Sequence, residues 1–501
     1  MTTSGTGQRS VGEQRDVSAT GAVSFLAVRN GDGGRGQTAA ELALHVLAQA
    51  PPAVTASFPF TLSDHPRLET LARAYGLQHR IRVREDAASS LEGSLDALVI
   101  DEGQIQTPGE LLDRLQGTGP AFAVVPDDGV LRDHCIAVIT NIPIHYRVGL
   151  FDRLASRLAA DGAELHVFFL SDVPPDRHWI QKPAIGFSHE FLESFDVGRD
   201  GGRRLVPRSL HQALDRLAPT IVLSAGFSPL VSQRVARWCS GRSVFGLWSG
   251  EISSRPTAKN AIRAIQRRCV VGRADFAIAY GSASAAYLRS LRADLPVVIG
   301  RNSTICPEPT SRRGPNRCVE LLAVSRAEQG KALELIVEAV LSLRDLDCRL
   351  TVIGAGKAIP ALRARAHGSW RIRFLGALPP TRVLEQYAKA DVFLFPSQYD
   401  VFGLVLVEAM AAGLAVVSSD KPGAVADLAA PGSNCILVSE RSADAWARAI
   451  RRVVEDGALR ERLGAAAQRT IASRWTLEHA ADAMVAGFRL GALSAPTARA
   501  A

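Results

Sequence analysis

Two acidic residues flank a strand-to-helix transition near residue 400. An apolar run at 392–396 predicts a buried strand, and Asp400 lies in the loop that follows it. Gly403 then opens a predicted helix over 404–412, which carries Glu408. A helix N-terminus presents backbone N–H groups and a partial positive charge, which suits a diphosphate, while carboxylates accept hydrogen bonds from sugar hydroxyls. The pattern predicts a site for a sugar joined to a diphosphate; the alternative is an ordinary strand–turn–helix whose charges face solvent.

Two cations stand in a second loop of the same kind. Arg326 and Lys331 follow an apolar strand-like run at 319–324 and precede a helix-like run at 332–342. Arg can grip a diphosphate as a bidentate fork and Lys as a point charge. Alone, such a pair is most often surface charge. Beside the acidic loop, we interpret it as part of the same site.

Strand-like and helix-like runs alternate along the chain, which is typical of α/β folds with parallel sheets. We predict two Rossmann-like domains facing a cleft: an acceptor domain over 131–315 and a nucleotide-sugar-binding domain over 316–490. An extra α/β domain of unassigned role, 19–130, precedes them. The segments 1–18 and 491–501 are predicted tails. In such sheets, ligands bind outside the carboxyl ends of the strands.

The segment around Phe402-Gly403-Leu404 resembles the signature of family four of the retaining GT-B glycosyltransferases, also called glycosyl transferases group 1. In that family, two Glu separated by seven residues flank Phe-Gly. Here Asp400 stands where the first Glu is usual, and Glu408 matches the second. The resemblance implies a GT-B fold, in which the first acid contacts the donor sugar and the second holds the ribose.

The resemblance extends over residues 134–490 and is strong from 319 onward. It implies that Arg326 and Lys331 stabilise the leaving diphosphate. Two glycine-containing turns are similar to the family's strand-end turns. One is an Ile-Gly-Ala-Gly turn that contains Gly354, and the other is a Leu-Gly-Ala-Leu turn that contains Gly376 and Leu378. The resemblance implies that the second turn holds the nucleotide base.

The reaction so implied is transfer of a hexose from a UDP- or GDP-linked sugar to a hydroxyl acceptor. It implies retention of anomeric configuration and no metal or other cofactor. The acceptor is expected to be a glycan or lipid-linked precursor of a cell-surface polysaccharide. Two rivals remain open: a non-catalytic GT-B scaffold that binds nucleotides, and a nucleotide-sugar epimerase.

Candidate acceptor-side residues follow two strands of the first Rossmann-like domain. His145, Tyr146 and Arg147 come after the strand predicted at 135–140. Arg147 stands at a helix start, where a cation is unfavourable unless it meets an anion. Glu251 follows the strand predicted at 243–248, where many family members carry a His that is missing here. The alternative for His145 and Glu251 is a structural or surface role.

The net charge of +8 and the pI of about 9.3 favour an anionic partner. No basic run is interleaved with aromatic residues, which argues against nucleic acid. One predicted helix carries a four-residue cationic spacing that can lie on an anionic membrane. This stripe comprises Arg255, Lys259, Arg263 and Arg267. The alternative is a solvated helix face.

No signal-peptide pattern marks the first 18 residues, and the longest apolar stretch, 401–417, is too short for a bilayer span. The seven cysteines are scattered, which disfavours a disulfide framework or a zinc site. We therefore expect a cytoplasmic protein that lies peripherally at the inner face of the membrane. A Gly-x-Gly-x-x-Gly match at 31–36 lacks the acidic partner of a dinucleotide site and is weak evidence.

Overall fold

A computed structural model describes residues 25–28, 55–58, 81–83, 97–100, 130–172, 183–197, 205–228, 230–253, 258–307, 318–328 and 330–494. The chain divides into two compact units, one formed by 1–106 with 114–120 and the other by 107–113 with 121–501. The predictions for residues 1–18, for the 31–36 loop, for Arg255 and for the Lys259 side chain fall outside the described residues.

The first unit contains a parallel sheet of four described strands, in the order β3-β2-β1-β4. The strands are β1 (Phe25–Val28), β2 (Thr55–Phe58), β3 (Ile81–Val83) and β4 (Ala97–Ile100). The order places consecutive strands on one side of β1 and then reverses, as in doubly wound α/β folds. The segment predicted as an extra α/β domain therefore contains a parallel sheet.

The second unit begins with a seven-stranded parallel sheet in the order β13-β12-β11-β10-β5-β6-β7. Its strands are β5 (Cys135–Thr140), β6 (Glu164–Phe169), β7 (Ser188–Phe191), β10 (Ile221–Ala225), β11 (Val244–Ser249), β12 (Phe276–Ala279) and β13 (Val297–Ile299). The helices between them are α4 (His145–Ala160), α5 (Leu210–Leu217), α6 (Ser232–Cys239), α7 (Ala258–Val271) and α8 (Ser282–Leu291). A small hairpin, β8 (Ser194–Asp196) with β9 (Leu205–Pro207), lies apart from this sheet.

A six-stranded parallel sheet follows, in the order β16-β15-β14-β17-β18-β19. Its strands are β14 (Val319–Val324), β15 (Cys348–Ile353), β16 (Ile372–Gly376), β17 (Val392–Phe395), β18 (Ala415–Ser419) and β19 (Cys435–Val438). The order is that of a Rossmann fold, and the strands are short apolar runs because helices cover both faces. Two core clusters confirm this arrangement, one on each face of the sheet.

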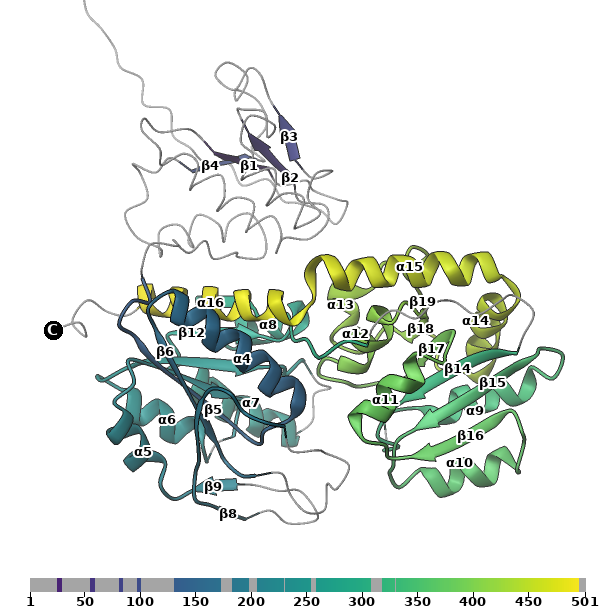
Figure 1. Cartoon of the computed structure of the whole chain (residues 1–501), viewed down its shortest axis with the longest axis horizontal. Coiled ribbons are helices and arrows are strands. Elements are labelled where there is room, and N and C mark those ends of the chain that lie inside the picture. Colours follow the sequence, from purple (N-terminus) through teal and green to yellow (C-terminus); the bar gives the residue numbers. More distant parts are fainter. Residues whose placement is uncertain are drawn as a thin grey trace, which may run out of the picture. The chain divides into compact units, whose positions relative to one another are not determined.

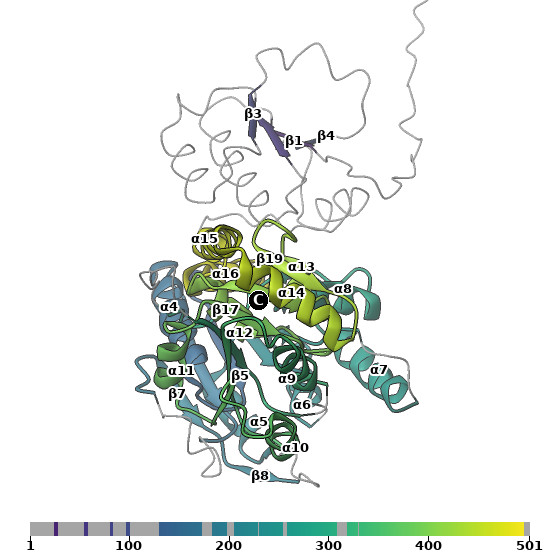
Figure 2. The same cartoon turned by 90° about the vertical axis from the view of Figure 1, so that its right-hand side faces the viewer.

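One face of this second sheet is covered by α9 (Leu333–Ser342), α10 (Ile359–Ala366) and α14 (Ala443–Glu455). The other face is covered by α11 (Pro380–Tyr387), α12 (Leu404–Ala411), α13 (Val425–Leu428) and α15 (Gly457–Arg474). Figure 2 shows α9 and α10 on the opposite side of this domain from α11. We call the domain with β5–β13 the acceptor half and the domain with β14–β19 the donor half.

The last helix, α16 (Leu477–Ser494), returns to the acceptor half, where it runs beside α4 (Figure 1). Its apolar residues, among them Leu477, Met484 and Phe488, belong to the core under β5–β12. The predicted domain boundary at 490 and the predicted tail from 491 differ from this arrangement. The apolar residues of 477–490 follow the donor half in sequence, but they complete the core of the acceptor half.

Within the part of the chain that the structure describes, no helix has both the length and the apolar content to cross a bilayer.

Candidate active site

The loops that carry Arg326, Lys331 and Asp400 lie side by side where the strand order of the donor half reverses. β14 and β17 are neighbours in the sheet although two strands separate them in sequence. The loop after β14 carries Arg326 and Lys331, and the loop after β17, which we call the donor loop (397–403), carries Asp400. The Gln398 N–H donates to the Gly330 carbonyl at 2.7 Å and joins the two loops. This is the position at which open α/β sheets bind their ligands.

Lys331 and Asp400 form an ion pair between these loops. The Lys331 Nζ donates to the Asp400 Oδ2 at 2.7 Å and to the Tyr399 carbonyl at 3.1 Å. Both side chains are mostly buried. The ammonium therefore fixes the conformation of the donor loop at the carboxyl edge of the sheet.

Arg326 lies on the same loop as Lys331 but is oriented differently. Its side chain is 74% exposed, and its Nη1 lies 3.6 Å from the Glu328 Oε1. The backbone of this loop is at the sheet edge, while the guanidinium extends into solvent. The side chains of the two predicted cations therefore have different partners and do not lie together in this structure.

Glu408, on α12, lies in an enclosed environment shared by both halves. The Tyr387 hydroxyl, from α11, donates to its Oε2 at 2.8 Å. The Thr304 Oγ1, from the segment between β13 and β14, lies 3.5 Å from its Oε1. Burial raises the pKa of Glu408 to about 7. No motif in the sequence points to Thr304 or Tyr387, because both come from segments far from residue 408.

Glycines permit the backbone approach that forms this edge. Gly354 has φ = 134°, and a Cβ there would overlap the Ser325 carbonyl oxygen. The Ala327 N–H donates to the Ala355 carbonyl at 3.0 Å, so the loop after β15 supports the one that carries Arg326. Gly403 has φ = 101° and is the N-cap residue of α12. Only glycine adopts such angles without strain.

The other predicted donor-site residues have different surroundings. Phe402 is buried and its ring stacks on Trp475, with centroids 6.0 Å apart. Leu404, which begins α12, and Leu378 are partly buried against the same core. Gly376 ends β16 with φ = 73° and accepts from the Gly354 N–H at 2.8 Å. Through its buried ring, Phe402 thus holds the end of the donor loop against the core of the donor half.

The acceptor-side candidates at 145–147 lie at the start of α4. The Arg147 guanidinium lies 3.8 Å from the centroid of the Trp248 ring and donates to the Tyr280 hydroxyl. Its Nη1 and the His145 Nδ1 are buried without a hydrogen-bond partner. Burial lowers the pKa of His145 and raises that of Tyr146, which also senses the Glu408 charge. The start of α4 therefore lies near Glu408.

Glu251 is held by a residue that the sequence had assigned to a membrane-facing stripe. Arg267 pairs with the Glu251 Oε2 at 3.0 Å and donates to the Tyr287 hydroxyl at 2.9 Å. Its side chain is 16% exposed, whereas Ile265, on the same helix, is 64% exposed. Arg263 is exposed. The helical spacing was right, but Arg267 does not belong to an outward stripe, because Glu251 and Tyr287 draw it inward.

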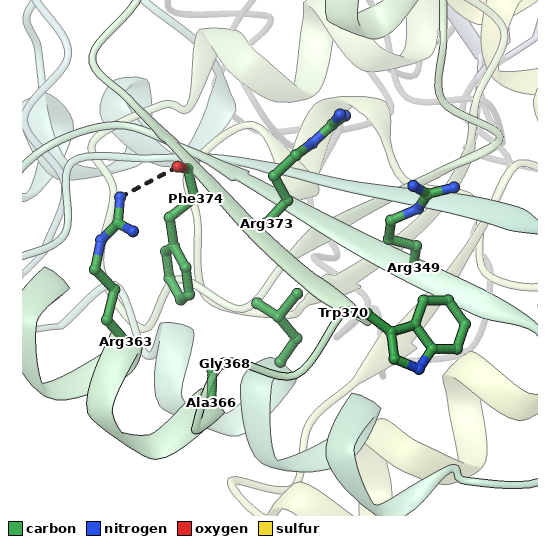
Figure 3. A pocket seen from close by; sticks show the side chains of 8 residues that line it. Arg349, Arg363, Ala366, Gly368, Trp370, Arg373 and Phe374 are labelled. Carbon is green, nitrogen blue, oxygen red and sulfur yellow. Dashed lines mark hydrogen bonds between the residues drawn. The ribbon is translucent and has the colours of Figure 1, made fainter.

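A separate hollow of about 560 Å³ lies at the beginning of β15 and β16 (Figure 3). Trp370, Ile372 and Phe374 line it together with Arg349, and Arg363 donates to the Phe374 carbonyl at 3.2 Å. The start of parallel strands is the edge opposite to the one that carries Lys331 and Asp400. We therefore do not include this hollow in the candidate active site.

Among the described residues, no group of three or more His, Cys, Asp or Glu side chains is arranged to hold a metal ion.

The two Rossmann-like halves, facing each other across a cleft, define the GT-B fold. Solved structures confirm it. The sucrose-phosphate synthase of Thermosynechococcus elongatus superposes on 71% of this chain and 98% of its own, with a TM-score of 0.56 and 19% identity. HepE of Anabaena, solved with UDP and glucose, superposes on 70% of this chain and 98% of its own, with a TM-score of 0.54 and 16% identity.

The donor half carries a recognisable domain: residues 315–470 match the family model of glycosyl transferases group 1. A D-inositol 3-phosphate glycosyltransferase of Corynebacterium diphtheriae is 31% identical over 170 residues, which are 32% of this chain and 38% of that protein. A glycogen synthase of Mycobacterium tuberculosis is 33% identical over 177 residues, which are 34% of this chain and 42% of that protein. The chain thus spans about two fifths of the length of these relatives.

Proposed function

We propose that this protein is a glycosyltransferase that moves a hexose from a UDP- or GDP-linked sugar to a hydroxyl acceptor, with retention of anomeric configuration. The observation that carries the proposal is the Lys331–Asp400 pair at the strand-order reversal of the donor half, in the loop that leads into α12 and its Glu408. HepE, which shares the fold, was solved with UDP and glucose. In this proposal, Glu408 accepts hydrogen bonds from ribose hydroxyls and Asp400 from a sugar hydroxyl.

Departure of the nucleoside diphosphate develops negative charge, which needs a counter-charge in place before the reaction. Lys331 supplies a fixed ammonium, and the N-terminus of α12 adds its partial positive charge. Arg326 begins in solvent, so in this proposal its side chain swings onto the diphosphate when the donor binds. No resident metal is part of this mechanism. Gly354, Gly376 and Leu378 shape the part of the site that takes the nucleotide.

The proposed acceptor is a glycan or lipid-linked precursor of a polysaccharide, met by His145, Tyr146, Arg147 and Glu251. We further propose a cytoplasmic location, with Arg263 and the exposed Ile265 of α7 resting on the anionic inner face of the membrane. Arg267 is not part of this surface, because Glu251 neutralises its charge.

Donor binding is tested by a thermal-shift screen of UDP, GDP, ADP and their glucose, galactose and mannose derivatives, since a ligand raises stability only if it binds the folded state. Against the best nucleotide, Lys331→Ala is expected to lose roughly 10- to 100-fold in affinity by calorimetry, the usual worth of one charge-assisted contact. Lys389→Ala, at an exposed lysine just past α11, is the matched control and should bind normally. Equal affinity of both variants would contradict the role of Lys331.

The reaction products then distinguish sugar transfer from the two alternative functions, an epimerase and a nucleotide-binding scaffold. Transfer is expected to release the nucleoside diphosphate only when an acceptor is present, and NMR of the product would show a retained anomeric configuration. An epimerase would convert the sugar without any acceptor. A scaffold would bind the nucleotide, with no turnover on any glycan or lipid-linked acceptor tried.

A further inference from the structure

One carboxylate of the donor half caps a helix of the acceptor half. The Asp427 side chain, on α13, accepts from the Ser282 N–H at 2.9 Å (Oδ2) and 3.1 Å (Oδ1), and its Oδ1 also accepts from the Ser282 hydroxyl. Ser282 is the first residue of α8, whose own N-cap position is Gly281 and whose first turn contains no acid. Helix N-termini need such an acceptor. Here it comes from 145 positions further along the chain.

The segment that carries Asp427 also holds the donor loop. The Gly423 N–H donates to the Asp400 carbonyl and the Ala424 N–H to the Phe402 carbonyl, both at 3.0 Å. Gly423 fits closely, because a Cβ there would overlap the Val401 carbonyl. The backbone on both sides of Val401 is therefore fixed by residues that lie only three or four positions before Asp427.

On the other side of the contact, α8 is tied to the acceptor-side segment. The Ser284 hydroxyl donates to the Ser249 carbonyl at 2.7 Å, and the Ser249 hydroxyl accepts from the Glu251 N–H at 3.1 Å. Gly281 has no room for a side chain, since a Cβ would overlap the Asp427 carboxylate. Hydrogen bonds, joined by short stretches of chain at 423–427 and 282–284, thus connect the Asp400 backbone with the Glu251 backbone through the Asp427–Ser282 contact.

We propose that Asp427 is a positioning residue for sugar transfer: by capping α8 it sets the donor loop against the segment that carries Glu251. The proposal rests on the proposed function and adds a residue that lies outside the nucleotide site itself. Without this cap, the donor loop keeps its residues but loses its fixed position relative to the acceptor half. The expected defect is loss of alignment between donor and acceptor rather than loss of a substrate contact.

The first test is hydrogen exchange of the intact chain, which needs no substrate. Asp427→Ala is expected to speed exchange at least tenfold at Ser282, Gly423 and Ala424. The matched control is Asp456→Ala, which removes a carboxylate that caps α15 within the donor half by accepting from the Leu459 N–H at 2.8 Å. It should speed exchange at Leu459 and leave 282 and 423–424 unchanged. Unchanged exchange at 423–424 in Asp427→Ala would overturn the proposal.

The second test separates positioning from simple destabilisation. With the donor found by the screen above, Asp427→Ala is expected to raise the ratio of donor hydrolysis to transfer about tenfold, whereas Asp456→Ala should keep the wild-type ratio. Ser282→Ala, which removes only the hydroxyl bond and keeps both N–H bonds, should fall in between. Equal ratios in Asp427→Ala and Asp456→Ala would contradict a positioning role. If wild type binds no nucleotide at all, the proposed function fails while the exchange experiment still decides whether the cap fixes the donor loop.

Discussion

Glu408 shows how a single side chain can couple the site to pH. Its carboxylate lies between the Tyr387 hydroxyl and Thr304, and burial raises its pKa to about 7, from an ordinary value of 4.5. In the unfolded chain the same group ionises near its ordinary value. Between these two values the unfolded state releases a proton that the folded state retains, so the unfolding free energy falls as the pH rises through this window.

We expect Glu408→Gln, which keeps an acceptor for Tyr387 without the charge, to remove this pH dependence. Between pH 5 and pH 8 the wild type should lose roughly 2.5 kcal/mol more unfolding free energy than the variant, because the folded pKa of about 7 lies well above the ordinary value of 4.5. Urea unfolding at the two pH values measures it, and all other titrating groups cancel in the comparison. An equal loss in both proteins would show that Glu408 titrates normally.

At the residue scale, the sequence predicted which strand ends carry the candidate residues better than it predicted the partners of their side chains. It indicated that Lys331 and Asp400 follow strands of the same sheet, since strand ends are visible in sequence, and the structure brings their loops together. It did not predict their direct pairing, the solvent-facing side chain of Arg326, or Thr304 and Tyr387 beside Glu408, because these depend on distant segments meeting. For Arg267 the helical period was correct, but the period alone does not tell which face a neighbouring carboxylate will attract.

At the scale of elements, the site depends on loops that touch through their backbones. Gly354 lets the loop after β15 pack directly on the loop that carries Arg326. The alternation of apolar runs predicted these strands well, because parallel strands buried on both faces are apolar throughout. The packing of one strand-end loop on the next could not be predicted, since a Gly-rich turn follows a strand in most α/β proteins.

Gly354→Ala is expected to cost about 3 kcal/mol or more, because it combines a left-handed φ with overlap of the Ser325 carbonyl. Gly368→Ala is the matched control: φ is 68°, and nothing lies within 4 Å of the added methyl group. That variant should lose only about 1 kcal/mol. Thermal melts compare the two, and a similar cost in both would mean that the loop contact contributes little.

At the scale of the whole molecule, α16 makes the acceptor half incomplete without the end of the chain. Phe488 is fully buried there and packs edge-to-face on Phe276, with centroids 6.2 Å apart. The sequence indicated two Rossmann-like halves and the order of their elements. It did not assign α16 to the first half, because an amphipathic helix carries no sign of which sheet it will cover.

Phe488→Ala should destabilise the acceptor half by about 3–5 kcal/mol, the usual cost of emptying a buried aromatic site. Hydrogen exchange read by mass spectrometry is expected to show faster exchange in peptides from β5, β10 and β12, while peptides from β14, β15 and β17 keep their protection. The conservative Phe488→Leu should show a smaller effect in the same peptides. Faster exchange confined to the donor half would contradict this assignment of α16.

Because α16 goes back to the first half, the polypeptide passes between the halves twice, once between β13 and β14 and once between Arg474 and Leu477. Two crossings define an axis, so the motion that they allow between the two halves is a rotation about that axis and not free separation. A protease cut in either crossing alone would leave both lobes attached to each other. The two crossings together form a hinge, and changing the angle to which the two halves open would require altering both crossings.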